Sequence, residues 1–403
     1  MAASMFSPMK LQAPSVTRLT SDVLVKATSR FACARSVFLA AGALLGLLTL
    51  GGCGGGGGGG GGNPDGIAPV AFVYPPSLAA ATSTDNVDGF ISPYALDTLG
   101  KSISPVTTTV FGTSPNAGQI AIAVGDIVLP SPSGLTEPGF VVTFNPADSS
   151  STLLTNSPLN SLSLTPPCNN CLKTVTAPAT VNGVTTATVT FTYLDPTSAA
   201  FPLTYSVLGI WAKPTTTGTN SGLDLSWKEV GGAFSAGVLT RGIDLPTTGT
   251  ASYDGYFIGR YATSVDNLTP GVLAGNYLVG ANAHAGVDFS ITGAGGVTFN
   301  TSNTQISGGG LVTPVAESRL DLTTLTPMTI TRTSTGNSFQ GTVVSNATGF
   351  FQSAPTNPNV VGAFYGPPAT TAPFAPPEAG GALSVTNGST QSMVGSFALK
   401  KNP

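Results

Sequence analysis

Apolar and polar side chains alternate in several long segments of this chain. The segment 186–193 carries threonine on one face, and its other face carries Ala187, Val189, Phe191 and Tyr193. The same period of two recurs in the segments 250–261, 339–344 and 392–399. Since successive side chains of a strand point to opposite faces, this pattern predicts half-buried antiparallel strands. After residue 66 no segment has the capped periodicity of a helix, so we expect an all-β protein with one or two short helical turns, for example near Pro376–Ala379.

Two local patterns refine this prediction. Asn182-Gly183 lies between two β-rich runs and predicts a hairpin, because a type I′ turn needs positive φ at both central residues. In the segment 250–261 small and aromatic residues share one face, namely Ala251, Tyr253, Gly255, Phe257, Gly259 and Tyr261. Large rings fit a curved interior only beside small partners, so this face predicts a closed antiparallel barrel in the C-terminal half.

The first 52 residues have the features of a signal peptide. Basic residues precede Val37–Leu50, an uncharged apolar run that is too short to span a membrane comfortably. The run ends in Leu50-Gly51-Gly52-Cys53, which resembles a bacterial lipobox. We therefore expect Cys53 to be acylated and to become the mature N-terminus, anchored by more than one acyl chain. The alternative is an ordinary cleaved signal or an anchor helix, with Cys53 incidental.

An unbroken glycine run, Gly54–Gly62, follows this cysteine. It satisfies a nucleotide-binding glycine pattern only trivially, since no strand, helix or acidic residue stands where that motif needs them. We interpret residues 53–70 as the lipidated cysteine and a flexible tether. By similarity to other bacterial lipoproteins, Gly rather than Asp after the cysteine favours sorting to the outer membrane.

Composition and charge narrow the classes of protein further. Only 8% of the 403 residues are charged, against roughly 25% in an average soluble domain. Hydrophobic residues make up 41%, which supplies material for a core despite 51 Gly and 32 Pro. A formal net charge of −3 argues against a phosphate-binding surface, so we expect no nucleic-acid partner. We place a boundary in the segment 227–237, which contains a Gly pair, and predict β-rich domains at 71–235 and 236–403.

Few residues suggest chemistry. Cys168 and Cys171 form a lone Cys-x-x-Cys, which we expect to be a local disulfide in an oxidising envelope, with free thiols or a redox role as alternatives. His284 is the only histidine, so haem ligation or base catalysis would depend on it; a plain surface residue is the simpler interpretation. We interpret two carboxylate pairs as solvated loop charges rather than a glycosidase pair, namely Asp85 with Asp88 and Asp224 with Glu229. No enzyme, cofactor or metal site is predicted.

The C-terminal half contains six motifs, at 203–211 (ending in Gly-x-Trp), 232–234, 244–255, 362–367, 378–384 and 395–401. In sequence and in order they resemble those of transferrin-binding protein B-like surface lipoproteins. The resemblance implies an antiparallel C-terminal barrel of about eight strands, preceded by a smaller β-rich handle. The family usually places its Glu-x-Gly-Gly soon after Gly-Pro, whereas here seven residues separate Ala369 from Pro377.

The sequence and the resemblance together predict a function. We expect a bacterial outer-membrane lipoprotein, exposed at the cell surface, that binds a host or environmental protein or an iron or haem source without catalysis. Its specificity would lie in the loops and in the N-terminal region, since rigid β scaffolds commonly carry function there. The alternative is a structural or adhesive envelope lipoprotein without a discrete ligand.

Overall fold

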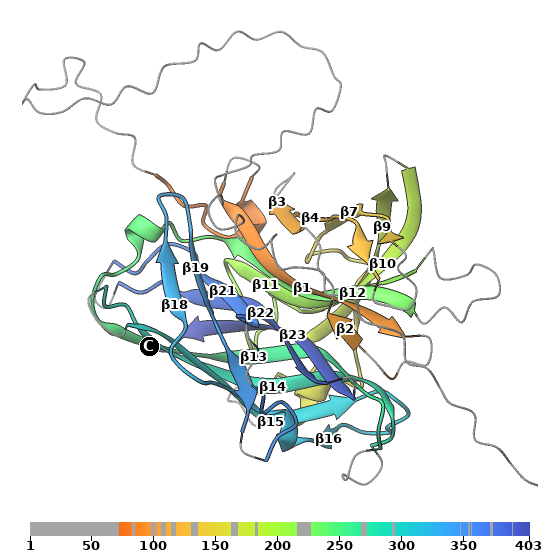
Figure 1. Ribbon diagram of the computed structural model, residues 1–403. Helices are drawn as coiled ribbons and strands as arrows, with labels where there is room; N and C mark the ends of the chain where they lie inside the picture. The colour runs from red at the N-terminus through yellow and green to blue at the C-terminus, as the bar shows by residue number, and fades with distance from the viewer. Residues whose placement is uncertain are drawn as a thin grey trace, which may run out of the picture. The chain divides into compact units, whose positions relative to one another are not determined.

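The chain is all-β, as predicted, in a computed structural model (Figure 1). The structure describes residues 72–403 except 83–84, 98–100, 102, 106–109, 114–117, 130–135, 163–167, 182–183, 216–226, 267–271, 292–294, 347, 354, 356, 371–373 and 389. The signal peptide, Cys53 and the glycine tether therefore lie outside the described residues. Within the described part of the chain, no helix is long and apolar enough to be a membrane span.

The first sheet has ten antiparallel strands in the order β2-β1-β12-β11-β10-β9-β7-β4-β3, with β8 paired to β9. Its members are β1 (Val87–Asp97), β2 (Ile103–Pro105), β3 (Val110–Thr113), β4 (Ile120–Val124), β7 (Phe140–Phe144), β8 (Thr152–Leu153), β9 (Leu172–Val181), β10 (Val184–Leu194), β11 (Ser206–Pro214) and β12 (Trp227–Val238). Two short strands, β5 (Ile127–Val128) and β6 (Thr136–Glu137), pair separately. Aromatic rings of β7, β10, β11 and β12 pack in one buried cluster on this sheet.

The predicted hairpin is confirmed by strand pairing. β9 and β10 pair in antiparallel fashion as far as Val181 and Val184. The turn residues 182 and 183 themselves lie outside the described residues. In β10 the face predicted to be apolar carries three fully buried side chains, those of Val189, Phe191 and Tyr193, so the alternation did indicate the buried face.

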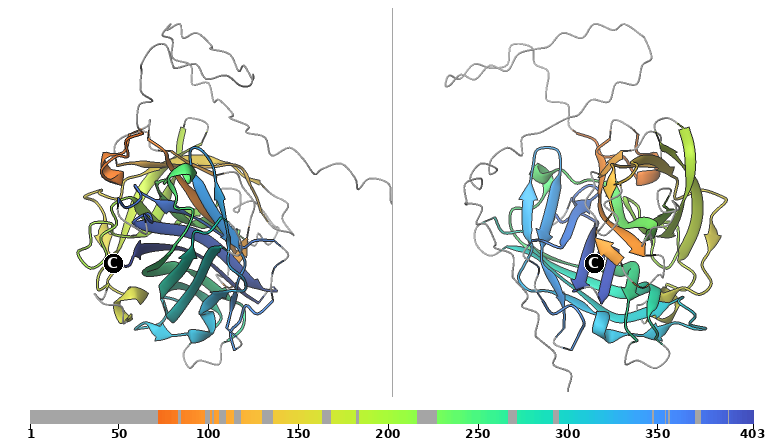
Figure 2. Two further views of the ribbon diagram at one scale, coloured as in Figure 1. Left: turned by 90° about the vertical axis from the view of Figure 1, so that its left-hand side faces the viewer. Right: turned by 45° about the vertical axis from the view of Figure 1, so that its right-hand side comes forward.

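The second sheet has eleven strands in the order β18-β19-β21-β22-β23-β13-β14-β15-β17-β20, with β16 paired to β15. Its members are β13 (Thr250–Thr263), β14 (Gly275–Asp288), β15 (Gly296–Ser307), β16 (Val315–Ala316), β17 (Leu322–Thr324), β18 (Thr329–Arg332), β19 (Asn337–Gly341), β20 (Val343–Ser345), β21 (Val360–Tyr365), β22 (Glu378–Asn387) and β23 (Gln391–Lys401). β19 pairs with β21, whereas β20, only one residue further on, pairs with β17. This bent segment joins the two ends of the strand order, so the sheet curls back on itself (Figure 2).

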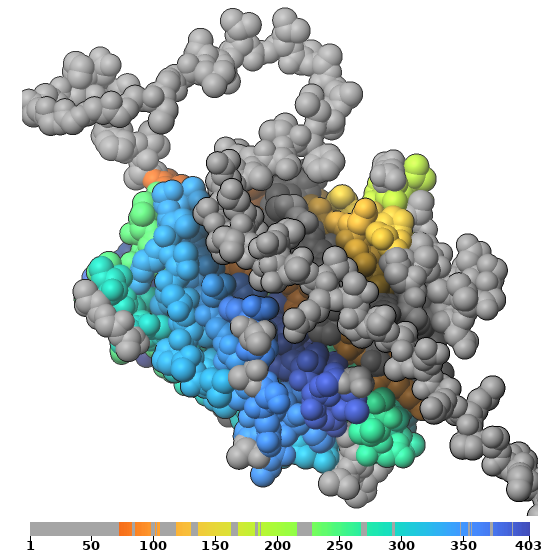
Figure 3. All heavy atoms as spheres, in the orientation of Figure 1, coloured from red at the N-terminus to blue at the C-terminus, as the bar shows by residue number. Residues whose placement is uncertain are grey.

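Small residues and aromatic rings alternate inside the curled sheet, as the sequence predicted. A Cβ atom added to Gly395 of β23 would overlap the ring of Phe257 on the adjacent strand β13. Phe257, Phe299 and Phe397 all lie in the buried cluster of this sheet. Residues of the C-terminal part of the chain, coloured blue, make up much of the face seen in the space-filling view (Figure 3).

The segment chosen as a domain boundary is a strand. β12 pairs with β1 on one side and with β11 on the other, so residues 227–238 are not a linker. Its Gly pair makes room for rings: a Cβ on Gly231 would meet Tyr94, and a Cβ on Gly232 would meet the indole of Trp211. The chain reaches the second sheet only after Val238. The division into two domains stays a prediction.

The prediction of a helical turn near Pro376–Ala379 is wrong. Glu378 begins β22 and lies opposite Lys400 of β23. The carbonyl of Pro376 accepts a hydrogen bond from the hydroxyl of Tyr253 at 2.9 Å, which helps fix this approach to the strand. The described 3-10 turns lie elsewhere, at η1 (Leu78–Ala80), η2 (Pro158–Ser161), η4 (Gly242–Asp244) and η5 (Ser318–Leu320).

The two sheets pack against each other through apolar residues. Tyr256, Ile258 and Ala398, on the outer faces of β13 and β23, lie in one buried cluster with Leu203 and Leu208. β13 and β23 were predicted to be half-buried, but much of both faces is buried because the first sheet covers the outer one. This junction brings residues far apart in the sequence together.

Candidate ligand-binding cleft

A cleft of about 200 Å³ lies at the margin of the junction between the sheets. Residues of β10, β11, β12 and β13 line it, among them Thr190, Thr192, Ala212, Pro214, Glu229 and Arg260. Strand pairing fixes most of these positions, since Thr190 lies opposite Ala212 and Pro214 lies opposite Glu229. The walls are therefore backbone-paired strands, which hold the side chains in place before any ligand arrives.

Arg260 and Glu229 supply the charged groups of the cleft. Nη1 of Arg260 donates to Oδ1 of Asn276 at 2.9 Å, and Nη2 lies 4.0 Å from Oε1 of Glu229. Tyr94 donates its hydroxyl to that same Oε1 at 3.0 Å. A separation of 4.0 Å is beyond hydrogen-bond distance, so the guanidinium and the carboxylate face each other without a direct hydrogen bond.

The surroundings set the charge of each group. Burial opposes the positive charge of Arg260, but Tyr94 and Glu229 outweigh that effect, so the pKa of Arg260 is raised. Burial also raises the pKa of Tyr94 well above its ordinary value. At neutral pH the guanidinium therefore stays charged and the phenol stays protonated. These groups offer hydrogen bonds and charge to a ligand rather than proton transfer.

Glu229 is the residue whose sequence interpretation is wrong. It was interpreted as a solvated loop charge, but it lies in β12 with a side chain only 20% exposed, beside Arg260. Its proposed companion Asp224 lies outside the described residues. Arg260 lies on the outer face of β13 together with Tyr256 and Ile258, the face that the first sheet covers. The available signal was the spacing on this face, where two apolar residues, Tyr256 and Ile258, are followed by a charged one, Arg260.

Both residues of the other carboxylate pair, Asp85 and Asp88, accept hydrogen bonds from nearby backbone N–H groups. Asp85 accepts a hydrogen bond from the backbone N–H of Thr82 at 2.7 Å. Asp88, in β1, is exposed and accepts one from the N–H of Gly89 at 2.7 Å. Neither residue lines the cleft around Arg260.

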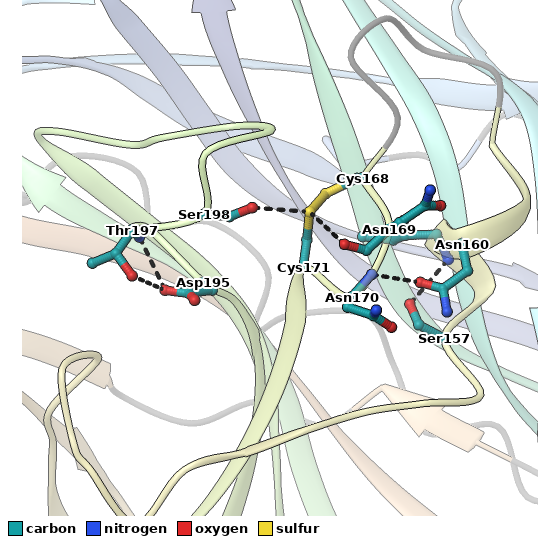
Figure 4. The surroundings of a disulfide bond; sticks show 10 residues. Ser157, Asn160, Cys168, Asn169, Asn170, Cys171, Asp195, Thr197 and Ser198 are labelled. Atoms are coloured by element: carbon teal, nitrogen blue, oxygen red, sulfur yellow. Dashed lines mark hydrogen bonds between the residues drawn. A yellow bond between two sulfur atoms is a disulfide. The ribbon is translucent and has the colours of Figure 1, made fainter.

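Cys168 and Cys171 are joined as a disulfide, and both are fully buried (Figure 4). Oδ1 of Asn160 accepts the backbone N–H of Asn170 at 2.9 Å, which ties the small loop between the cysteines to the turn η2. Asn170 adopts a positive φ of 58°, a conformation that asparagine tolerates better than most residues. The disulfide and this hydrogen bond together hold the short loop against the turn η2.

His284 forms a cross-strand contact on the outer surface of the second sheet. Its Nδ1 lies 2.7 Å from Oδ1 of Asp254, the residue opposite it in β13. Both side chains are nearly half exposed, at 44% and 46%. Oδ2 of the same aspartate accepts a hydrogen bond from Asn402 at 2.7 Å. No cluster of three metal-ligating residues occurs among the residues that the structure describes.

Comparison with known proteins gives similarity only at the level of structure. No family model and no curated protein sequence matches the chain. A double mutant of transferrin binding protein B from Haemophilus parasuis Hp5 matches with 16% identity and a TM-score of 0.32, over 73% of this chain and 53% of that one. Isotype 1 of the same protein from serogroup B Neisseria meningitidis matches with 16% identity and a TM-score of 0.28, over 74% and 53%. The chain thus spans about half the length of these solved structures.

Proposed function

We propose that this protein is a bacterial outer-membrane lipoprotein, anchored through Cys53, that binds a partner at the cell surface without catalysis. The partner would be a host or environmental protein, or a carrier of iron or haem. The observation that carries the proposal is the cleft between the sheets, where Arg260 and Glu229 are held on paired strands and Nε of Arg260 has no hydrogen-bond partner among the described residues.

Binding fits the chemistry of this cleft. Oriented polar groups on a rigid scaffold give specificity, because little side-chain freedom is lost when the ligand arrives. A guanidinium that keeps its charge and a phenol that keeps its proton suit recognition. The lipobox-like segment and the glycine run would attach this scaffold to the membrane while letting it reach a partner.

The binding proposal is tested by capture experiments with the full chain. The immobilised protein is exposed to serum and to haem-containing medium, and retention is measured as the input increases. We expect saturable retention of one partner by the wild type and loss of it in Arg260→Gln. Lys228→Gln is the matched control, since it removes one positive charge from an exposed position next to Glu229. Absence of saturable retention across a broad panel would favour the structural or adhesive alternative.

The anchor is tested separately. Globomycin, which blocks lipoprotein signal cleavage, should make the precursor accumulate, and Cys53→Ser should abolish acylation. Protease treatment of intact cells should remove the protein if it faces outward. If globomycin leaves processing unchanged, the assignment of Cys53 as the lipidated residue is wrong.

A further inference from the structure

The size of the cleft limits what can enter it. Pockets that enclose a drug-sized ligand measure roughly 300–1,000 Å³, whereas this cleft measures about 200 Å³. That volume suits one side chain of a larger partner better than a whole cofactor. Ile210, Ala212 and Pro214 contribute apolar wall, against which a short aliphatic stem would pack.

Two polar groups in the cleft have hydrogen-bonding capacity to spare. Nη2 of Arg260 lies 4.0 Å from Oε1 of Glu229, beyond hydrogen-bond distance, and Nε of Arg260 is buried without a hydrogen-bond partner among the described residues. Glu229 accepts the Tyr94 hydroxyl through Oε1, and the described part of the chain places no donor on Oε2. A matching ligand group therefore carries an acceptor for the guanidinium and, beside it, a donor for the carboxylate.

The charges decide between the candidate groups. Arg260 and Glu229 carry opposite unit charges, so their sum is zero and a neutral group matches the pair. A ligand carboxylate would be attracted by the guanidinium of Arg260 but repelled by the carboxylate of Glu229. An ammonium group would be attracted by Glu229 but repelled by Arg260. Like charges brought this close without solvent between them weaken binding strongly.

We propose that the cleft receives the carboxamide side chain of an Asn or Gln on a protein partner. The amide oxygen would accept from Nη2 of Arg260, the amide nitrogen would donate to Glu229, and the methylene stem would lie against Pro214 and Ala212. This assignment rests on the proposed function, since it names the chemical group by which a protein partner would be recognised.

Small probes test the chemistry directly. The full chain is labelled with ¹⁵N-arginine and titrated separately with propionamide, propionate, propylamine and propane-1,2-diol, and the Nε–H signal of Arg260 is followed by NMR. We expect propionamide to bind at least about tenfold more tightly than the charged probes, since each of those meets a like charge. The diol, which offers a donor and an acceptor without the planar amide, should bind more weakly than propionamide.

Two variants sharpen the result. Glu229→Gln keeps the shape and an acceptor for Tyr94 but removes the negative charge, so it should reverse the order and make propionate the tighter probe. Arg260→Gln, followed through the backbone amides of Thr190 and Thr192, should lose both probes. Lys228→Gln should behave like the wild type. Near-ultraviolet circular dichroism shows that each variant is folded.

Either of two results would overturn the carboxamide assignment. One is a wild type that prefers propionate, propylamine or the diol. The other is no response at up to about 100 mM, well above the affinity expected of a fragment of five heavy atoms. These results differ from failure of the proposed function, which shows as absent partner capture whatever the probes do. Partner capture that depends on Arg260, with propionate as the preferred probe, would keep the binding function and replace the ligand class.

Discussion

Glu378 is the residue whose replacement should most directly test how the two sheets are held together. It begins β22 in the second sheet, and its side chain is buried at the start of β11 in the first. Oε1 accepts the N–H of Thr204 at 2.6 Å, and Oε2 accepts the N–H of Tyr205 at 3.1 Å and the hydroxyl of Ser206 at 2.7 Å. One carboxylate thus joins three consecutive residues to the opposite sheet.

The cost of removing this side chain follows from those contacts. Leaving a buried donor without its acceptor costs about 1–3 kcal/mol, and less where water can replace the partner. Thr204 is exposed, Tyr205 is partly exposed and Ser206 is fully buried, so the lower end of the range applies to the first two. We expect Glu378→Ala to lower the free energy of unfolding by about 3 kcal/mol. Glu378→Gln keeps the shape and one acceptor, so it should cost about 1–2 kcal/mol at a pH near 4.

The pH dependence separates burial from hydrogen bonding. Burial raises the pKa of Glu378 above its ordinary value, although the backbone and Ser206 hydrogen bonds and Lys400 act in the opposite direction. The native state then holds the proton more tightly than the unfolded state. Wild-type stability from this residue is full below the ordinary carboxyl pKa and is lost as the pH rises through the raised one. Glutamine does not titrate, so the deficit of Glu378→Gln should shrink as the pH rises from about 4 to about 7.

Urea denaturation followed by circular dichroism, at several pH values between these limits, measures the difference between the two proteins. A fixed dependence of the unfolding free energy on urea would show that the variants change native stability rather than the unfolded state. If the deficit of Glu378→Gln grows with pH, the hydrogen bonds outweigh burial, the carboxylate is favoured in the native state, and the reasoning above is refuted.

Two further predictions concern ion pairs of different burial. Lys213 and Glu137 form an ion pair in which both side chains are almost fully buried, at 1% and 0% exposure. Lys213→Met should therefore lower the free energy of unfolding, measured by thermal or urea denaturation, by about 3–5 kcal/mol. Adding Glu137→Leu should restore much of that stability, because no unpaired buried charge then remains. A double variant less stable than the single variant would contradict this. Burial raises the pKa of Asp195, but Lys173 and Thr197 outweigh that effect, so the pKa is lowered overall. Nζ of Lys173 lies 2.8 Å from Oδ2 of Asp195. Its contribution is then present above the ordinary carboxyl pKa and lost as the pH falls through the lowered one, so Asp195→Asn should cost about 1–2 kcal/mol at neutral pH and progressively less below about pH 4; a cost that is constant with pH would contradict it.

The strands could be predicted because alternation is a local property. Val189, Phe191 and Tyr193 share a face whatever the rest of the chain does, and the sequence identified that face correctly. Small residues opposite rings were also recognisable, as Gly395 and Phe257 show, because a ring inside a curved sheet needs space on its neighbour. These signals concern one strand or one adjacent pair.

The junction between the sheets could not be predicted in the same way. Gly231 and Gly232 resemble a linker in the sequence, but they are a strand segment on which Tyr94 and Trp211 lie. Their small size makes room for the rings of Tyr94 and Trp211, which lie far away in the sequence. A composition signal cannot distinguish a glycine that frees the backbone from one that admits a ring.

The position of Arg260 follows from the same junction. Along the outer face of β13, Tyr256 and Ile258 are fully covered by the first sheet, whereas Arg260, two residues further on, lies at the margin with its side chain 26% exposed. A charge in the middle of that apolar contact would pay a large desolvation cost, and a charge in open water would be screened. At the margin the guanidinium keeps access to a ligand while low-dielectric walls strengthen its interactions. The edge of an apolar sheet–sheet contact is therefore the place where a chain this poor in charge can make a single charged pair effective.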